Sequence, residues 1–307
     1  MNGSSYRVLI DTDPGLGKKG PDVDDGLALF FMLNNPEMFE IEGITTVFGN
    51  TRIKVGYSLL EDYLGIVGRT EIPHKMGARS KKEMGELNEA SSFIIEMVKE
   101  YPNELILFTL GPLTNVSTAL KNYSELFDDL KKIVFMGGLL EQLDIFDSDS
   151  LDTGGLFKTT EFNFFMDPLA TQLFIETDTS TPRIGMGLDI CCKALFQERH
   201  LSKIKAVNKP IPQFIVDDVN YWLELWKLRN MDGFYPFDTM VPIYLIKPDL
   251  FTAKDVFLKV DTEETLGKLT ILDNIKENTA PITYCMDFRE PLGAEEFMDI
   301  LVSGLIK

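Results

Sequence analysis

The sequence has few cysteines and no long apolar run. Its 307 residues include only three cysteines, Cys191, Cys192 and Cys285, so we expect no disulfide framework. No apolar run approaches the ~20 residues of a membrane span, and the N-terminus lacks the basic and apolar regions of a signal peptide. These absences favour a cytoplasmic protein with no membrane partner.

Positive charge is also scarce. The chain has 30 Lys and Arg against 48 Asp and Glu, which gives a formal net charge of −18. A phosphate backbone would meet a repelling field, and this argues against a nucleic-acid partner. The acids either keep the chain soluble or gather in a cleft around a cation, and only their positions separate these two interpretations.

Short apolar runs alternate with amphipathic stretches along most of the chain. The pattern predicts strands at 7–11, 39–49, 104–111, 131–138 and 180–188, and helices at 24–35, 55–67, 90–102, 112–122, 167–177, 213–230 and 238–248. This alternation predicts an α/β fold with an open, mostly parallel sheet flanked by helices, and the length fits one large domain or two small ones. Sites in such sheets lie at the carboxyl ends of the strands, which here read DTDPG, VFGN, TLGP and FMGG.

The segment 7–33, RVLIDTDPGLGKKGPDVDDGLALFFML, contains a G-x-G-x-x-G pattern at 15–20. A dinucleotide-binding loop is disfavoured, because the helical pattern begins only near Asp24 and two acids at its start would repel a pyrophosphate. An EF-hand is also disfavoured, because Leu16 occupies the position of the obligatory turn glycine.

Four aspartates flank this loop, namely Asp11, Asp13, Asp24 and Asp25. Ca²⁺ takes six to eight oxygen ligands, and clustered aspartates supply them. The alternative is structural: Asp24 and Asp25 only cap the helix, while Asp11 and Asp13 only turn the chain. This loop alone leaves both interpretations open.

The pattern D-x-D-P-G followed by D-D resembles the N-terminal signature of the inosine-uridine preferring nucleoside hydrolases. Further blocks resemble that family in the same order: VFGN (47–50), TLGPLTNVSTAL (109–120), IVFMGG (133–138), EFNFFMDPLA (161–170), GMGLDI (185–190) and FDTMVPIYLIKPDLF (237–251). The resemblance implies a single Rossmann-like domain over residues 1–307 and an enzyme that hydrolyses the N-glycosidic bond of ribonucleosides. It also implies a bound Ca²⁺ that holds the nucleophilic water and the ribose 2′- and 3′-hydroxyls, and a homodimer or homotetramer.

The resemblance assigns a role to each matching residue. Asp13 matches the general base. The implied Ca²⁺ ligands are Asp13, Asp25, Asp238 and the backbone carbonyl of Leu110. The implied ribose-binding residues are Asp24, Asn50, Glu161 and Asn163, with Asp11 as a supporting aspartate. Negative charge around the sugar suits this reaction, because its transition state resembles an oxocarbenium ion.

Two departures from the family concern the 5′ side of the sugar. The family joins D-P-G to D-D by one residue, whereas eight residues, LGKKGPDV (16–23), intervene here. Lys18 and Lys19 then lie either at the rim of the cleft or in solvent. The asparagine that contacts the 5′-hydroxyl aligns with Gly155. One hypothesis is therefore a 5′-extended riboside, such as a nucleotide or an ADP-ribose-like compound, although the net charge argues against it.

A third departure concerns the leaving base. Phe237 stands where many members have a histidine that protonates the base, and His74 and His200 lie outside the matching blocks. Some purine-preferring members stack the base between aromatics, and Phe237, Trp222 and Trp226 could do so here, somewhat favouring purines. Spacing of four on a helix is also typical of core packing. The alternative function is a non-catalytic or altered-specificity homologue that binds ribose or ADP-ribose.

Overall fold

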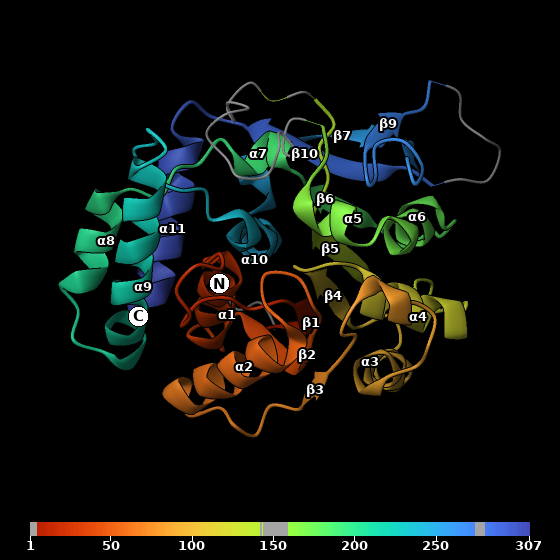
Figure 1. The fold of residues 1–307 in the computed structure, drawn as a ribbon, viewed down its shortest axis with the longest axis horizontal. Helices are drawn as coiled ribbons and strands as arrows, with labels where there is room; N and C mark the ends of the chain where they lie inside the picture. The colour runs from red at the N-terminus through yellow and green to blue at the C-terminus, as the bar shows by residue number, and fades with distance from the viewer. Residues whose placement is uncertain (1–4, 142, 144–158, 274–279) are drawn as a thin grey trace.

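The computed structural model describes residues 5–141, 143, 159–273 and 280–307. Within these residues, eight strands form one sheet in the order β3-β2-β1-β4-β5-β6-β10-β7, from the bottom to the top of Figure 1. The strands are β1 (Tyr6–Thr12), β2 (Phe39–Thr46), β3 (His74–Met76), β4 (Ile106–Thr109), β5 (Lys132–Met136), β6 (Arg183–Met186), β7 (Phe251–Val256) and β10 (Ile282–Phe288). Neighbouring strands are parallel except β7 and β10, which are antiparallel.

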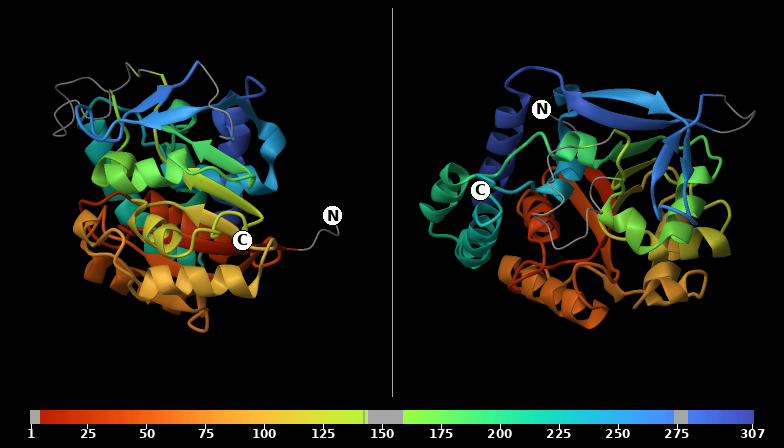
Figure 2. Two further views of the ribbon diagram at one scale, coloured as in Figure 1. Left: turned by 90° about the vertical axis from the view of Figure 1, so that its right-hand side faces the viewer. Right: turned by 45° about the horizontal axis from the view of Figure 1, so that its top comes forward.

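Helices cover both faces of the sheet (Figures 1 and 2). One face carries α1 (Asp24–Leu33), α2 (Ile53–Val67), α8 (Glu198–Lys205), α9 (Pro210–Lys227), α10 (Met240–Ile246) and α11 (Gly293–Ile306). The other carries α3 (Glu89–Glu100), α4 (Thr114–Asn122) and α6 (Pro168–Glu176), with the hairpin β8 (Leu258–Val260) and β9 (Leu269–Ile271) beside α6. Two short helices, α5 (Phe162–Met166) and α7 (Leu188–Cys191), follow β5 and β6. No helix in the described part of the chain is long and apolar enough to cross a bilayer.

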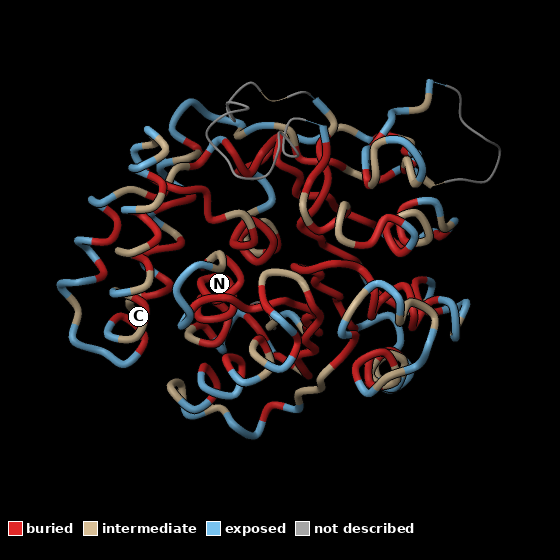
Figure 3. The backbone as a smooth tube through the Cα atoms, viewed as in Figure 1, coloured by how far each residue is buried: buried red, intermediate tan, exposed pale blue. Residues whose placement is uncertain are grey.

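The central strands are buried on both faces, as the red tube in Figure 3 shows. In β1, Val8 and Ile10 pack in one hydrophobic core and Leu9 packs in the other. In β4, Phe108 packs in the first core and Leu107 in the second. Covered parallel strands read as continuous apolar runs because neither face meets water. The predicted α/β fold with an open, mostly parallel sheet is confirmed.

Some element boundaries differ from the sequence pattern. The predicted helix at 112–122 was wrong at its start, because α4 begins at Thr114 and the chain before it packs against Asp13. The pattern also assigned no structure to 251–306, where β7, β10 and α11 lie. In β7 the exposed and buried positions alternate only weakly, since this strand lies at the edge of the sheet.

Candidate active site

A cavity of 350 Å³ opens at the carboxyl ends of the parallel strands. Asn50 follows β2, Leu110 follows β4, and Met136 ends β5. Most of the predicted site residues line it: Asp24, Asn50, Leu110, Glu161, Asn163, Trp222, Trp226, Phe237 and Asp238. The cavity therefore lies where the topology of an open α/β sheet predicts a site.

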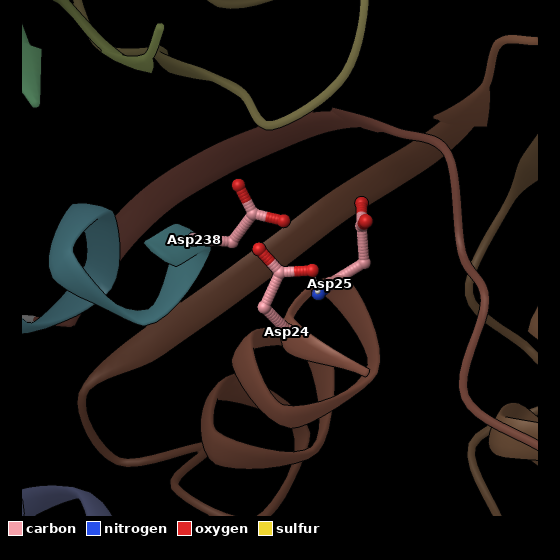
Figure 4. Close-up of side chains that lie close together, drawn as sticks. All are labelled: Asp24, Asp25 and Asp238. Atoms are coloured by element: carbon pink, nitrogen blue, oxygen red, sulfur yellow. Dashed lines mark hydrogen bonds between the residues drawn. The ribbon is translucent and has the colours of Figure 1, made fainter. Parts of the chain in front are cut away.

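Three aspartates form an acidic cluster at the cavity. Asp24 and Asp25 lie in the first turn of α1, and Asp238 lies in the short 3-10 helix η3 (Phe237–Thr239), far along the chain. All three are buried, and their nearest carboxylate oxygens lie within 4.8 Å of one another. Figure 4 shows the three carboxylates directed toward one another from the two elements.

Asp25 is held from three directions. Its Oδ1 accepts hydrogen bonds from the Thr12 hydroxyl and from the backbone N–H of Asp13 at 3.0 Å. Its Oδ2 accepts one from the Asn50 side chain at 2.8 Å. The carboxylate is thus fixed by the end of β1 and by the loop after β2.

Asp13 lies immediately behind the cavity wall. Its Oδ2 accepts the backbone N–H of Asn50 at 2.6 Å, while its buried Oδ1 has no hydrogen-bond partner among the described residues. Glycines flank the carboxylate closely, since an added Cβ at Gly49 or Gly111 would come within 1.9 or 2.5 Å of its oxygens. These positions allow the chain to close tightly around Asp13.

Among the described residues, no Lys or Arg pairs with these buried acids. Burial raises the pKa of Asp13 and of Asp238 well above the usual range, and the neighbouring carboxylates raise both further. Burial also raises the pKa of Asp24 strongly, with like-charge repulsion from Asp25 adding to the effect. Carboxylates in this arrangement are stable as anions only with a nearby positive charge, so the donor set fits a hard cation.

Asp11 supports the site from beneath. Its Oδ1 accepts hydrogen bonds from Thr45 at 2.6 Å and from the Asn115 side chain at 2.8 Å. Asn115 also bonds the carbonyl of Thr46 and the N–H of Ala78, so it joins β1, β2 and the chain after β3 to α4. Burial raises the pKa of Asp11 to about 7.

Glu161 and Asn163 begin the short helix α5. Glu161 caps this helix, because its carboxylate accepts the N–H groups of Asn163, Phe164 and Gly138 at 2.6, 3.1 and 3.1 Å. Burial raises the pKa of Glu161 to about 7 despite these bonds. Asn163 donates to the carbonyl of Leu110 at 2.7 Å, which ties α5 to the end of β4.

One side of the cavity is aromatic, and we call it the aromatic wall: Trp222, Trp226 and Phe237, together with Arg229. The two tryptophans lie one turn apart on α9, with ring centroids 6.5 Å apart. Both tryptophans belong to the hydrophobic core and also line the cavity, so core packing is confirmed while stacking on a base stays a prediction. We call a second set of lining residues the polar wall: Asp24, Asn50, Leu110, Glu161, Asn163 and Asp238.

The insertion folds back as part of the cavity lining. Gly20, Pro21 and Asp22 line the cavity, and Gly17 and Gly20 have positive φ values of 98° and 110°. Lys18 and Lys19 are exposed outside the lining. The Lys19 ammonium lies 5.5 Å from the ring centroid of Tyr221 on α9. Gly155 lies outside the described residues.

Sequence reasoning missed two charged residues of the lining, Asp22 and Arg229. Asp22 accepts the N–H groups of Val23 and Asp24 at 2.6 and 3.3 Å, and burial raises its pKa to about 7. Asp22 lies in the insertion, which the family's motif does not contain, so the resemblance assigned it no role. Arg229 follows α9 in a stretch that reads only as an amphipathic helix end.

Comparison with known proteins matches residues 8–291 to the inosine-uridine preferring nucleoside hydrolases. The chain is 25% identical to uridine nucleosidase 1 of Arabidopsis thaliana, covering 88% of this chain and 83% of that protein. It is 26% identical to the pyrimidine-specific ribonucleoside hydrolase RihA of Photobacterium profundum, over 98% of this chain and 99% of that protein.

Solved structures share the fold. The plant nucleoside hydrolase PpNRh1 superimposes with a TM-score of 0.82 at 19% identity, over 98% of this chain and 99% of that one. The purine-preferring ribonucleoside hydrolase from Gardnerella vaginalis gives a TM-score of 0.81 at 22% identity, again over 98% and 99%. The chain belongs to the inosine-uridine preferring nucleoside hydrolase family, whose members are N-ribosyl hydrolases.

Proposed function

We propose that this protein uses Ca²⁺ to hydrolyse the N-glycosidic bond of ribonucleosides, releasing ribose and a free base. One observation carries the proposal: buried carboxylates from two distant elements converge at a cavity, and none of them forms an ion pair with a Lys or Arg among the described residues. Family membership supplies the reaction class, and the site supplies candidates for each role.

The proposed cation ligands are Asp13, Asp25, Asp238 and the Leu110 carbonyl. The Oδ1 of Asp238, which has no hydrogen-bond partner among the described residues, supports this assignment, since buried oxygens without hydrogen bonds are costly unless a ligand occupies them. The carboxylate of Asp24 lies with those of Asp25 and Asp238 and contributes to the same negative field. A bound Ca²⁺ would lower the pKa of a coordinated water and orient the ribose hydroxyls.

Asp13 is the proposed general base. Its Oδ2 is fixed by the Asn50 N–H, which leaves Oδ1 to accept the proton of the attacking water. Burial and, after it, the neighbouring carboxylates raise the pKa of Asp13. The water oxygen bonds to the anomeric carbon as the bond to the base nitrogen breaks.

The polar wall is the proposed ribose site. Asp24, Asn50, Glu161 and Asn163 offer oxygens and amides from different elements to a sugar ring lying in the cavity. Their carboxylates would stabilise the positive charge that develops on the sugar in the transition state.

The aromatic wall is the proposed base site. Trp222, Trp226 and Phe237 present rings to the cavity, and flat bases gain stacking contact from such rings. The larger purine gains more contact than a pyrimidine, so we propose that purines are somewhat favoured. The relatives named for uridine and pyrimidine ribonucleosides make uridine the competing substrate to compare.

A panel of substrates tests the proposal. Reducing-sugar release is measured from inosine, guanosine, uridine and cytidine, their 5′-phosphates and ADP-ribose, with added Ca²⁺ and after chelation. Turnover of plain nucleosides that is lost on chelation and restored by Ca²⁺ is the expected result. Absence of turnover on every compound would contradict it.

A second function is favoured by one observation, the Phe237 ring at the position of the usual leaving-group acid. A ribose- or ADP-ribose-binding protein would bind these compounds in calorimetry without turnover. We further propose a cytoplasmic homodimer or homotetramer, which light scattering of the purified protein and imaging of the tagged chain would test.

A further inference from the structure

The aromatic wall holds one cation beside its rings. Among the described residues that line the cavity, Arg229 is the only Lys, Arg or His. Its side chain is partly exposed, and it has neither an ion pair nor a hydrogen-bond acceptor within the described part of the chain. The guanidinium is therefore available to a ligand, unlike the nearby Lys227, which pairs with Glu224 at 2.9 Å.

The same wall contains an unused donor. The Trp222 side chain is 8% exposed and lines the cavity, yet its Nε1–H has no acceptor among the described residues. Buried N–H groups without a partner are rare in folded proteins and call for an explanation. An acceptor atom on a bound base would satisfy this donor.

Among the described residues, the aromatic wall includes no ordinary proton donor. The Phe237 ring carries no proton to give, and both histidines lie outside the cavity lining. His74 Nδ1 bonds the Ile72 carbonyl at 2.9 Å, and His200 Nδ1 accepts the Gln197 N–H at 2.9 Å. Glu161 belongs to the polar wall, and the backbone N–H groups that its carboxylate accepts favour the ionised form.

We propose that Arg229 stabilises the departing base as an anion, assisted by the Trp222 Nε1–H, so that no acid is needed. This inference rests on the proposed hydrolase function. A guanidinium stays protonated in proteins, so it supplies charge and hydrogen bonds rather than a proton. The substrate class is a riboside whose base carries acceptor atoms along the edge that faces Arg229 and Trp222.

The electron balance of this step is simple. The bond between the anomeric carbon and the base nitrogen breaks, and its electron pair leaves with the base. The attacking water bonds to the anomeric carbon and gives one proton to Asp13. The base anion, held by Arg229, takes a proton from solvent as it leaves.

The test compares substrates whose leaving groups differ in how much stabilisation they need as anions. Inosine and uridine leave as bases that require stabilisation, whereas p-nitrophenyl β-D-ribofuranoside releases an anion that is stable by itself. Arg229→Met should lower kcat on both nucleosides about 100-fold, the size of losing one preorganised charge donor, and lower kcat on the p-nitrophenyl riboside less than about threefold. Arg229→Lys should retain part of the activity, and Trp222→Phe should give a smaller loss with the same selectivity.

Lys227→Met is the matched control, because it removes a cation from the same helix end outside the cavity, and it should leave all rates unchanged. Equal losses on nucleosides and on the p-nitrophenyl riboside, or no loss in Arg229→Met, would overturn the role of Arg229. Melting temperatures of the variants show whether a loss of activity comes from misfolding. If the wild-type protein hydrolyses neither class of substrate, the proposed function itself fails.

Discussion

The two walls of the cavity are built differently. Residues of the polar wall come from several strand ends and helix starts, and neighbouring groups hold many of them by hydrogen bonds. The aromatic wall comes from one helix, α9, and the chain shortly after it, and packing against the core holds it. The sugar site is thus held by hydrogen bonds between several elements, whereas the base site depends on the packing of α9 and the chain after it.

The largest expected effect comes from removing Asp13, which lies directly behind the polar wall. Asp13→Ala should lower kcat on nucleosides about 10³-fold, because the proton acceptor and a cation ligand are both lost. Steady-state ribose release measures the change. Asp217→Ala, which removes an exposed carboxylate from α9, is the matched control and should keep wild-type kinetics. Near-normal activity in Asp13→Ala would end the proposed mechanism.

A smaller effect is expected at the aromatic wall. Trp226→Leu should raise KM for inosine about 10-fold while the catalytic groups of the polar wall keep kcat within about threefold, since stacking contributes about 1–3 kcal/mol per base. Initial rates over a range of inosine concentrations give both constants. A fall in kcat as large as that of Asp13→Ala would mean that the two walls are not separate.

The support beneath the polar wall predicts a change in stability. Asn115→Leu leaves Asp11 and two backbone groups without their buried partner, so the free energy of unfolding should fall by about 2–3 kcal/mol. Urea denaturation monitored by fluorescence measures it. The exposed Asn122, at the other end of α4, is the control: Asn122→Leu should change stability by less than about 0.5 kcal/mol. Equal losses of stability in the two variants would contradict the role of Asn115 in joining these elements.

The smallest effect concerns α8, which packs against α9 behind the aromatic wall. Burial lowers the pKa of His200 to about 4, so the folded protein binds fewer protons than the unfolded chain between about pH 4 and 6.5. Its contribution to stability is therefore full above pH 6.5 and is lost as the pH falls to 4. The melting temperatures of the wild type and of His200→Asn should converge as the pH falls toward 4. A difference that stays constant with pH would contradict the lowered pKa of His200.

The sequence named Trp222, Trp226 and Phe237 of the aromatic wall and the residues of the polar wall, but not Arg229. Asp24, Asn50 and Leu110 follow strand ends or begin helices, where local pattern fixes their place in a parallel sheet. Arg229 was missed because its approach to the cavity depends on how α9 packs, which no local pattern encodes. Asp22 was missed because it belongs to an insertion, whose path is set by contacts with distant elements.

The same distinction holds for the fold. The central strands were predicted because burial on both faces leaves uninterrupted apolar runs such as that of β4. The edge strand β7 and the short strand β3 lack such runs, and their positions come from pairing with distant neighbours. Predictions that need only local pattern succeeded more often than those that need tertiary contacts.

The most direct test of the central claim joins cation binding to hydrolysis. The protein is stripped of metal with chelator and titrated with Ca²⁺ in a calorimeter, and ribose release from inosine and uridine is measured at each occupancy. We predict that one Ca²⁺ binds per chain and that activity rises in proportion to occupancy. Full activity of the metal-free protein, or no binding of Ca²⁺ to it, would contradict the claim that these buried acids hold the cation that hydrolysis needs.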